Sequence, residues 1–158
     1  MKRDPSAEQE LPVLPYLALL GLFTSVYGGL LWVGAKKKVL PRRVAAYDIV
    51  LLGLATHRLT RIVTRDKVAE PIRSPFTEYE GPAGAGEVHE RPRGRGLRRA
   101  VGTLLTCQYC AGPWIASALF AGLVVRPRET RLFASMLAAT ALSDFTHQGY
   151  AYARGASA

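Results

Sequence analysis

The sequence has few cysteines, and it lacks the sets of residues that common catalytic sites need. Its 158 residues include two cysteines, Cys107 and Cys110, which are too few for the framework of a disulfide-stapled secreted domain. The sequence shows no glycine-rich phosphate-binding loop, no pair of catalytic carboxylates and no Ser-His-Asp set. We therefore expect a protein that is not an enzyme.

Charged residues are absent from one long stretch near the beginning of the chain. Residues 11–35 form an apolar run of 25 residues, and Lys36, Lys37 and Lys38 follow it directly. About 20 residues suffice for a helix to cross the hydrocarbon core of a bilayer. The run is also longer than the apolar core of a cleavable signal peptide. We predict a retained transmembrane helix at 11–35, preceded by a polar N-terminal tail at 1–10.

Negative charge is scarce relative to positive charge: 12 Asp and Glu against 21 Lys and Arg give a net charge of +9. Such an excess is typical of proteins that bind nucleic acid and of membrane proteins that face anionic lipid. Because the apolar runs favour the second class, the expected partners are the lipid bilayer and its anionic headgroups. A membrane protein partner or a second copy of the chain comes next, and nucleic acid ranks last.

The rest of the chain divides into three segments by composition. Residues 44–70 predict one long helix, apolar in its first half and amphipathic in its second, which crosses the membrane or lies at its interface. Residues 71–106 predict a basic flexible loop, because they are rich in Gly, Pro and Arg. Residues 107–152 predict a Cys-x-x-Cys turn and a helical hairpin, with small residues at 135, 139 and 143 as a close-packing face. The expected fold class is all-α: a small membrane helical bundle of three to four membrane-associated helices with a basic cytoplasmic loop.

The distribution of Lys and Arg predicts the orientation, because short cationic loops stay in the cytoplasm. If the helix at 44–70 crosses, an N-terminus inside places 13 cationic residues inside and 8 outside. If that helix lies at the interface, an N-terminus outside places 16 inside and 5 outside, which obeys the rule better. Both arrangements place residues 58–110 and the C-terminus in the cytoplasm, so we expect the basic loop and the Cys pair there in a multi-pass protein of the cell membrane.

The Cys pair at 107 and 110 is the most distinctive stretch, because two cysteines at this spacing can hold a metal ion or close a small disulfide. A helix that begins at Pro113 would direct its positive dipole end at Cys110 and favour the thiolate. In a reducing cytoplasm we expect a dithiol or a metal pair rather than a structural disulfide. Zinc or iron would need further ligands, for which His147 and His57 are candidates. An inert turn that packs the start of the helix is the alternative.

A second constellation is a cationic stripe formed by Arg58, Arg61 and Arg65, which recur at helical spacing. Their guanidinium groups, with that of Arg73, could hold the phosphate of an anionic lipid or of another ligand in a bidentate fork. The alternative is that the stripe only faces headgroups. Two acids are further polar candidates: Asp66, which could pair with the stripe, and Asp144, which is the only acid in the last predicted helix, from Thr130 to about Tyr152, and lies near its end.

Taken together, these residues resemble a known family. The resemblance covers roughly residues 44–150 and rests on the following matches: His57-Arg58-Leu59-Thr60-Arg61, Asp66-Lys67, Glu70-Pro71, Arg73, Cys107-x-x-Cys110, Trp114 and Ser143-Asp144-Phe145. The sequence is similar to the YjcA-like family of short bacterial membrane proteins, found in actinobacteria and in spore-forming bacilli. The YjcA-like member of the bacilli is linked to sporulation. The resemblance implies a multi-pass membrane protein with no assigned activity and no established cofactor.

Two functions follow from the residues and the resemblance. The first is an uncharacterised, non-enzymatic integral membrane protein, an envelope or sporulation-type accessory factor whose cationic cytoplasmic face binds lipid or a partner. The alternative is a metal- or thiol-dependent membrane protein that uses Cys107 and Cys110 with His147 or His57.

Overall fold

The computed structural model describes residues 13–84 and 86–156. The chain begins with the helix α1 (Val13–Lys36) and continues, in order, with α2 (Ala46–Thr64), the short 3₁₀ helix η2 (Lys67–Ala69), α3 (Glu70–Arg73), β1 (Thr77–Gly84), β2 (Glu87–Pro92), α4 (Gly96–Thr106), α5 (Gln108–Val125) and α6 (Pro127–Ala156).

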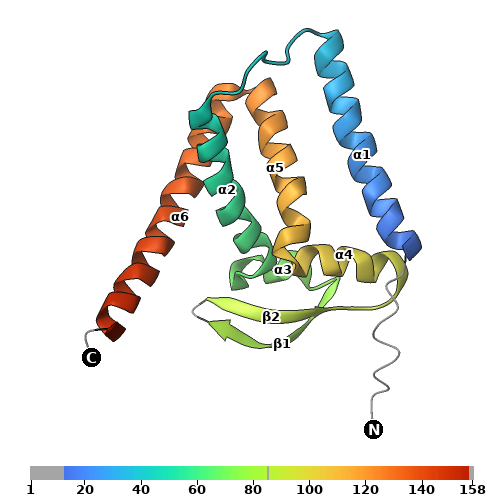
Figure 1. Ribbon diagram of the computed structural model, residues 1–158. Coiled ribbons are helices and arrows are strands. Elements are labelled where there is room, and N and C mark those ends of the chain that lie inside the picture. The colour runs from blue at the N-terminus through green and yellow to red at the C-terminus, as the bar shows by residue number, and fades with distance from the viewer. Residues whose placement is uncertain (1–12, 85, 157–158) are drawn as a thin grey trace.

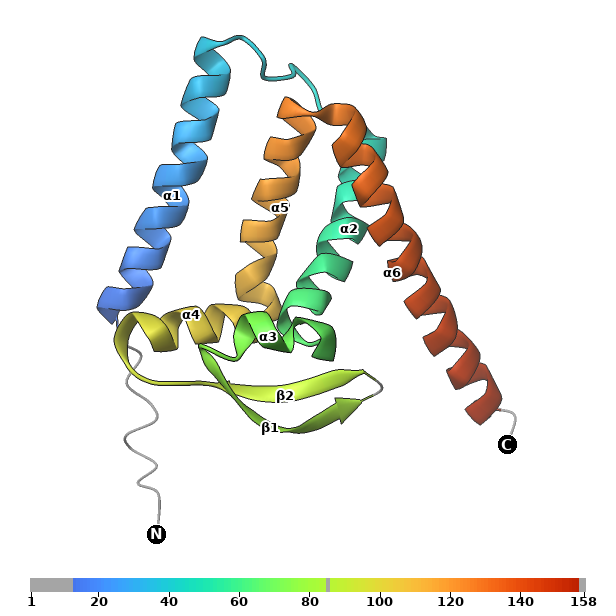
Figure 2. The same cartoon turned by 180° about the vertical axis from the view of Figure 1, so that it is seen from behind.

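Four long helices, α1, α2, α5 and α6, run lengthwise, and the remaining elements lie across one end of them (Figure 1). We refer to α3, β1, β2 and α4 together as the platform. The view from behind shows that α4 runs beneath the ends of α1 and α5, while α6 leans outward toward its C-terminal end (Figure 2). The link at 37–45 and the corner at Arg126 lie at the end opposite the platform. The start of α1 and the end of α6 therefore both lie at the platform end.

The fold is mostly helical, as expected, but it is not all-α, and residues 71–106 do not form a flexible loop. Strands β1 and β2 pair antiparallel in a two-stranded sheet, with Thr77 opposite Pro92 and Glu78 opposite Arg91. Opposite charges that face each other across an antiparallel pair stabilise it. The register shifts after Tyr79, where the chain contains Gly and Pro, and this irregularity interrupts the alternation by which a strand is recognised in sequence.

The predicted single helix at 44–70 is also wrong, because α2 ends at Thr64. The chain after α2 pairs with the turn between the two strands. The N–H of Lys67 donates to the carbonyl of Gly86 at 2.8 Å, and the N–H of Val88 donates to the carbonyl of Arg65 at 3.0 Å. These bonds satisfy backbone groups that a continuing helix would have used, so the hairpin determines where the helix ends.

The core lies where α2, α5 and α6 meet. Its buried residues come from all three helices: Leu51, Leu52, Ala55, Leu119, Leu123, Ala134, Leu137 and Ala138. Alanines on α6 allow the helices to approach closely. The predicted close-packing face of α6 was one residue out of register: Ala134 and Ala138 are buried, whereas Ser135 and Ala139 are exposed.

Helix α1 stands apart from this core and turns its apolar side chains outward. Among its residues, all of which the structure describes, Gly34 is the one that is buried. Leu14 is 79% exposed and Trp32 is 61% exposed. In the described part of the chain, α1 and α5 are the two helices long and apolar enough to cross a membrane by length and composition. The apolar surface of α1 is therefore available to contact something outside the protein.

Candidate functional site

A charged pocket lies at the platform end, where the end of α2, the turn after it, the start of β2 and α6 come together. Its volume is about 400 Å³. It is lined mainly by charged side chains: Arg58, Arg61, Asp66, Lys67, Val68, Gly86, Glu87 and Asp144. The structure thus brings together two arginines of the predicted stripe and both acids singled out in the sequence, and it adds Lys67 and Glu87.

Arg58 lies at the centre of the pocket, where it bridges two carboxylates from different parts of the chain. Its Nη2 lies 3.3 Å from Oδ2 of Asp66, and its Nη1 lies 3.1 Å from Oδ2 of Asp144. The side chain is only 21% exposed, and its Nε is buried and finds no hydrogen-bond partner in the described residues. Arg58 therefore ties α2 both to the turn after it and to α6.

Arg61 makes the second link of the pocket, an ion pair and hydrogen bond with Glu87 at the start of β2. The side chains of the pocket carry three cations and three carboxylates, so their charges balance. A lipid phosphate would have to displace a carboxylate from Arg58 or Arg61, and the structure does not favour the lipid contact predicted for them. Arg65 is half-buried at the end of α2, outside the residues that line the pocket.

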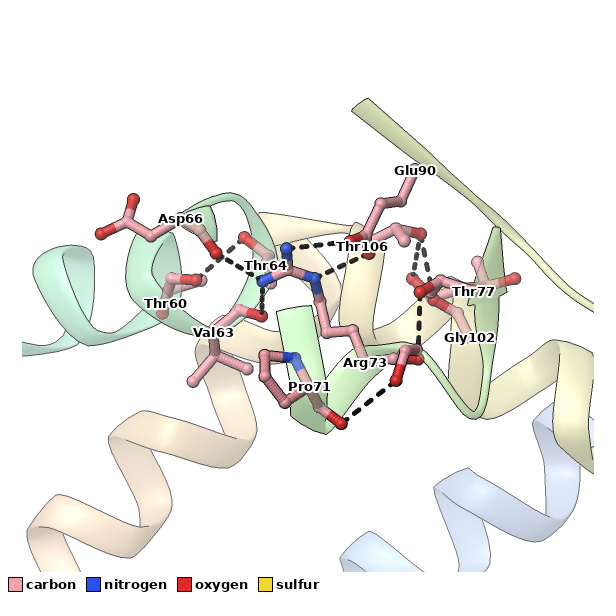
Figure 3. Close-up of polar contacts among 12 residues, drawn as sticks. Thr60, Val63, Thr64, Asp66, Pro71, Arg73, Thr77, Glu90, Gly102 and Thr106 are labelled. Atoms are coloured by element: carbon pink, nitrogen blue, oxygen red, sulfur yellow. Dashed lines mark hydrogen bonds and ion pairs between the residues drawn. The ribbon is translucent and has the colours of Figure 1, made fainter. Parts of the chain in front are cut away.

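Arg73 is completely buried, and the prediction that it binds an anionic lipid is wrong. Its Nε and Nη2 donate to the two carboxylate oxygens of Glu90 on β2, at 2.7 and 3.1 Å. Its Nη1 donates to the carbonyls of Val63 and Asp66, at 2.9 and 3.0 Å (Figure 3). The guanidinium therefore joins the last turn of α2, the turn after it and the hairpin. Its role is to hold the platform against α2.

Helix α4 approaches the hairpin at Gly102, which is buried. A Cβ at this position would collide with the carbonyl of Phe76 and would lie 3.2 Å from the Cα of Pro92. Only glycine allows this backbone approach. The close contact positions α4 crosswise beneath the long helices and so sets the geometry of the platform.

Cys107 and Cys110 form a disulfide, with their Cα atoms 5.2 Å apart, instead of the dithiol or metal pair that we expected. The helix after them also begins earlier than predicted: α5 starts at Gln108, so Pro113 lies inside it. Cys107 precedes the first turn, and its Sγ accepts a hydrogen bond from the N–H of Cys110 at 3.2 Å. Cys110 itself is exposed.

The predicted metal ligands are not brought together. His57 stacks on Phe145 of α6, with 5.3 Å between the ring centroids, and His147 is exposed further along α6. Across residues 13–84 and 86–156, no group of three or more His, Cys, Asp or Glu side chains could hold a metal ion. The set of Cys107, Cys110, His147 and His57 therefore does not form a zinc or iron site in this fold.

Sequence reasoning missed an ion pair at the opposite end of the helices. Asp48, in the first turn of α2, is 4% exposed and accepts from Arg131 of α6, at 2.8 Å from Nε and 2.9 Å from Nη2. The signal in the sequence was a lone acid in an otherwise apolar stretch. Its partner is 83 residues away, which no local pattern reveals.

Comparison with known proteins identifies the family. A profile of the family described as "Protein of unknown function (DUF1360)" matches residues 51–150. The chain belongs to this family. The DUF1360 match includes all residues that line the charged pocket, the Arg73–Glu90 pair and the Cys pair, whereas α1 lies outside it.

Two relatives of the DUF1360 chain come from Bacillus subtilis (strain 168). "Sporulation protein YjcA" is 35% identical over 98 residues, which are 60% of this chain and 83% of the relative. "UPF0713 protein YngL" is 33% identical over 89 residues, which are 54% of this chain and 65% of the relative. These matches confirm the resemblance to a YjcA-like family. No solved structure matches the chain.

Proposed function

We propose that the protein is a multi-pass integral membrane protein that serves as a non-enzymatic accessory factor of the cell envelope or of sporulation. The observation that carries this proposal is the outward-facing apolar surface of α1. Exposed apolar side chains continue along the outer faces of α2 and α6, for example at Val50 and Leu132. A continuous apolar surface of this extent is unstable in water and is solvated by lipid.

In this proposal α1, α2, α5 and α6 all cross the bilayer. Because α2 packs lengthwise beside α5 and α6 (Figures 1 and 2), the fold supports the crossing arrangement over the interfacial one. The polar and charged residues of α2 and α6 that lie within reach of lipid pair with one another or lie near the helix ends, which lowers the cost of insertion. The helix that lies crosswise is α4, which carries Leu97, Arg98 and Arg99 in its first turn.

The platform and both chain ends face the cytoplasm in this arrangement. The support is the charge count for the crossing arrangement, 13 cationic residues predicted on the cytoplasmic side against 8 on the other. Arg95 and Arg98 are exposed there on either side of the exposed, apolar Leu97 in sequence, a combination that suits anionic headgroups or the surface of a partner. The disulfide does not decide the side, since Cys-x-x-Cys pairs in the cytoplasm also form catalytic disulfides.

The accessory role is inferred from the pocket and from one relative. Each guanidinium of the pocket is engaged by a carboxylate of the same chain, which is typical of a structural charge network. The relative YjcA is named a sporulation protein. We propose that this chain takes part in the same process, sporulation, and we propose no reaction for it.

Cell fractionation tests the membrane proposal. Expressed in a bacterial host, the full chain should stay in the membrane pellet after alkaline carbonate washing and should require detergent for solubility. A chain recovered in the aqueous supernatant, monomeric without detergent, would rule the proposal out.

The disulfide favours a second candidate, thiol–disulfide exchange with a dithiol partner. In this reaction a partner thiolate attacks one sulfur of the pair, and a second partner thiol completes the transfer of two electrons and two protons. Cys107 and Cys110 become thiols while the partner becomes a disulfide. Because the exchange is reversible, the single thiolate that remains after one cysteine is replaced with Ser can attack the partner's disulfide, and the missing second cysteine cannot resolve the mixed disulfide. Such a variant should therefore accumulate this adduct in acid-quenched, alkylated cells. A pair that stays fully oxidised in the parent chain, with no adduct in either Ser variant, would eliminate this candidate.

A further inference from the structure

A long apolar groove separates α1 from α5. Its larger part has a volume of about 560 Å³ and lies toward the end opposite the platform. A smaller part, of about 200 Å³, continues toward Trp114, and Tyr27 and Leu30 line both parts. The two helices touch in the smaller part, where the rings of Phe23 and Trp114, which line it, meet edge to face with centroids 5.0 Å apart. The groove therefore runs along the membrane-facing part of the protein.

The open end of the groove is positively charged. Lys37 lines it directly, and Lys38, Arg42 and Arg43 are exposed in the same link between α1 and α2. Within the described residues, no carboxylate forms an ion pair with any of these four cations. The groove thus joins a long apolar channel to a cluster of uncompensated positive charge.

An apolar groove that ends at a cluster of cations is complementary to an anionic phospholipid. Because α1 ends at Lys36, the cations lie at the level of the headgroups, while the groove below them lies at the level of the acyl chains. A helix from a second copy would bring the same cations to the same end, and like charges repel. An anionic headgroup neutralises them, and an acyl chain fills the apolar space with favourable van der Waals contacts.

We propose that the groove binds one phospholipid with an anionic headgroup, with an acyl chain between α1 and α5 and the phosphate at Lys37. This inference rests on the proposed membrane location. It adds a specific lipid site at the end opposite the platform, separate from the charged pocket and from the headgroup contacts of the platform.

Native mass spectrometry of the full, detergent-purified chain tests the site, with phosphatidylglycerol and phosphatidylcholine as the probes. The parent protein should retain one phosphatidylglycerol and little phosphatidylcholine. Lys37→Gln should lower phosphatidylglycerol retention about fivefold, the effect of one cation near a lipid phosphate. Ala121→Phe, which places a ring in the groove, should reduce it to the level of phosphatidylcholine. Matched controls outside the groove, Arg128→Gln and Ala139→Phe, should bind as the parent does.

Three outcomes would overturn the site: equal retention of the two lipids, a Lys37→Gln variant that binds like the parent, or a dimer that Ala121→Phe abolishes. The last would show that a second copy fills the groove. Carbonate washing of the same variants separates this failure from failure of the membrane proposal. A chain that stays in the membrane without preferring phosphatidylglycerol contradicts the lipid site alone.

Discussion

Arg73 joins α3 to β2 through a bidentate, buried ion pair with Glu90, and its bond to the carbonyl of Val63 connects the platform to the end of α2. Breaking such a pair by removing one partner is costly, because the remaining charge stays buried without compensation. Arg73 is 0% exposed and Glu90 is 3% exposed, so water cannot replace either partner without unfolding the contact. The pair therefore fixes β2 against α3.

We predict that Arg73→Gln lowers the free energy of unfolding by about 3–5 kcal/mol. Arg91→Gln is the matched control, because Arg91 also pairs with a strand carboxylate, that of Glu78, but is 43% exposed. Loss of the Arg91–Glu78 ion pair should lower the free energy of unfolding by about 1 kcal/mol or less. Thermal unfolding in detergent measures both changes. Equal destabilisation by the two variants would contradict the structural role of Arg73.

Replacing each of two helical glycines with alanine should change the free energy of unfolding in opposite directions. Gly102→Ala should destabilise the protein, because its Cβ meets the backbone of Phe76 and Pro92. Gly53→Ala should stabilise it by about 0.5–1 kcal/mol, since Gly53 lies in α2 with open space around its Cβ position and alanine is the better helix former. The same unfolding assay compares them. A stabilising Gly102→Ala would show that α4 does not approach the hairpin closely.

Single residues also show why part of the site could not be derived from sequence. Arg58, Arg61, Asp66 and Asp144 were recognised, because helical spacing and isolated acids are visible in a linear pattern. Arg73 was assigned to the same cationic surface, since nothing near it in sequence reveals Glu90, which is 17 residues away on a strand. Burial of a charge is a property of the tertiary fold, and the sequence alone leaves it open.

At the level of elements, the helices were easier to predict than the hairpin. The apolar run at 11–35 became α1 almost unchanged, because length and composition are enough to specify such a helix. Strands β1 and β2 contain Gly and Pro, and their backbone ladder is supplemented by cross-strand ion pairs and by contacts with the end of α2. These partners are distant in sequence, so the segment had the composition of a loop.

Hydrogen exchange distinguishes an ordered hairpin from a flexible loop. We predict that the paired amides of β1 and β2 exchange more slowly than those of the link at 37–45, because their N–H groups are engaged in the ladder. Mass spectrometry of peptides from detergent-solubilised protein provides the comparison. Equally fast exchange in both segments would support the prediction of a flexible loop at 71–106 and contradict the ordered hairpin.

At the scale of the whole molecule, the mostly helical architecture with long apolar helices was predictable, whereas the membrane topology stays a prediction. Apolar runs and the charge excess indicated a membrane protein with a basic cytoplasmic face. The choice between a crossing and an interfacial helix at 44–70 depended on a count of charges, which favoured the interfacial arrangement. The lengthwise packing of α2 against α5 and α6 supports the crossing arrangement instead, since the three helices share one core.

The most direct test of the proposed orientation is cysteine labelling in intact cells with a membrane-impermeant maleimide. In a background with Cys107 and Cys110 replaced by Ser, one new cysteine is placed at each end of the molecule. Arg128→Cys, at the corner between α5 and α6, should be labelled in intact cells. Glu80→Cys, on β1, should be labelled only after the membrane is permeabilised. Labelling of Glu80→Cys in intact cells would contradict the cytoplasmic platform and with it the proposed topology.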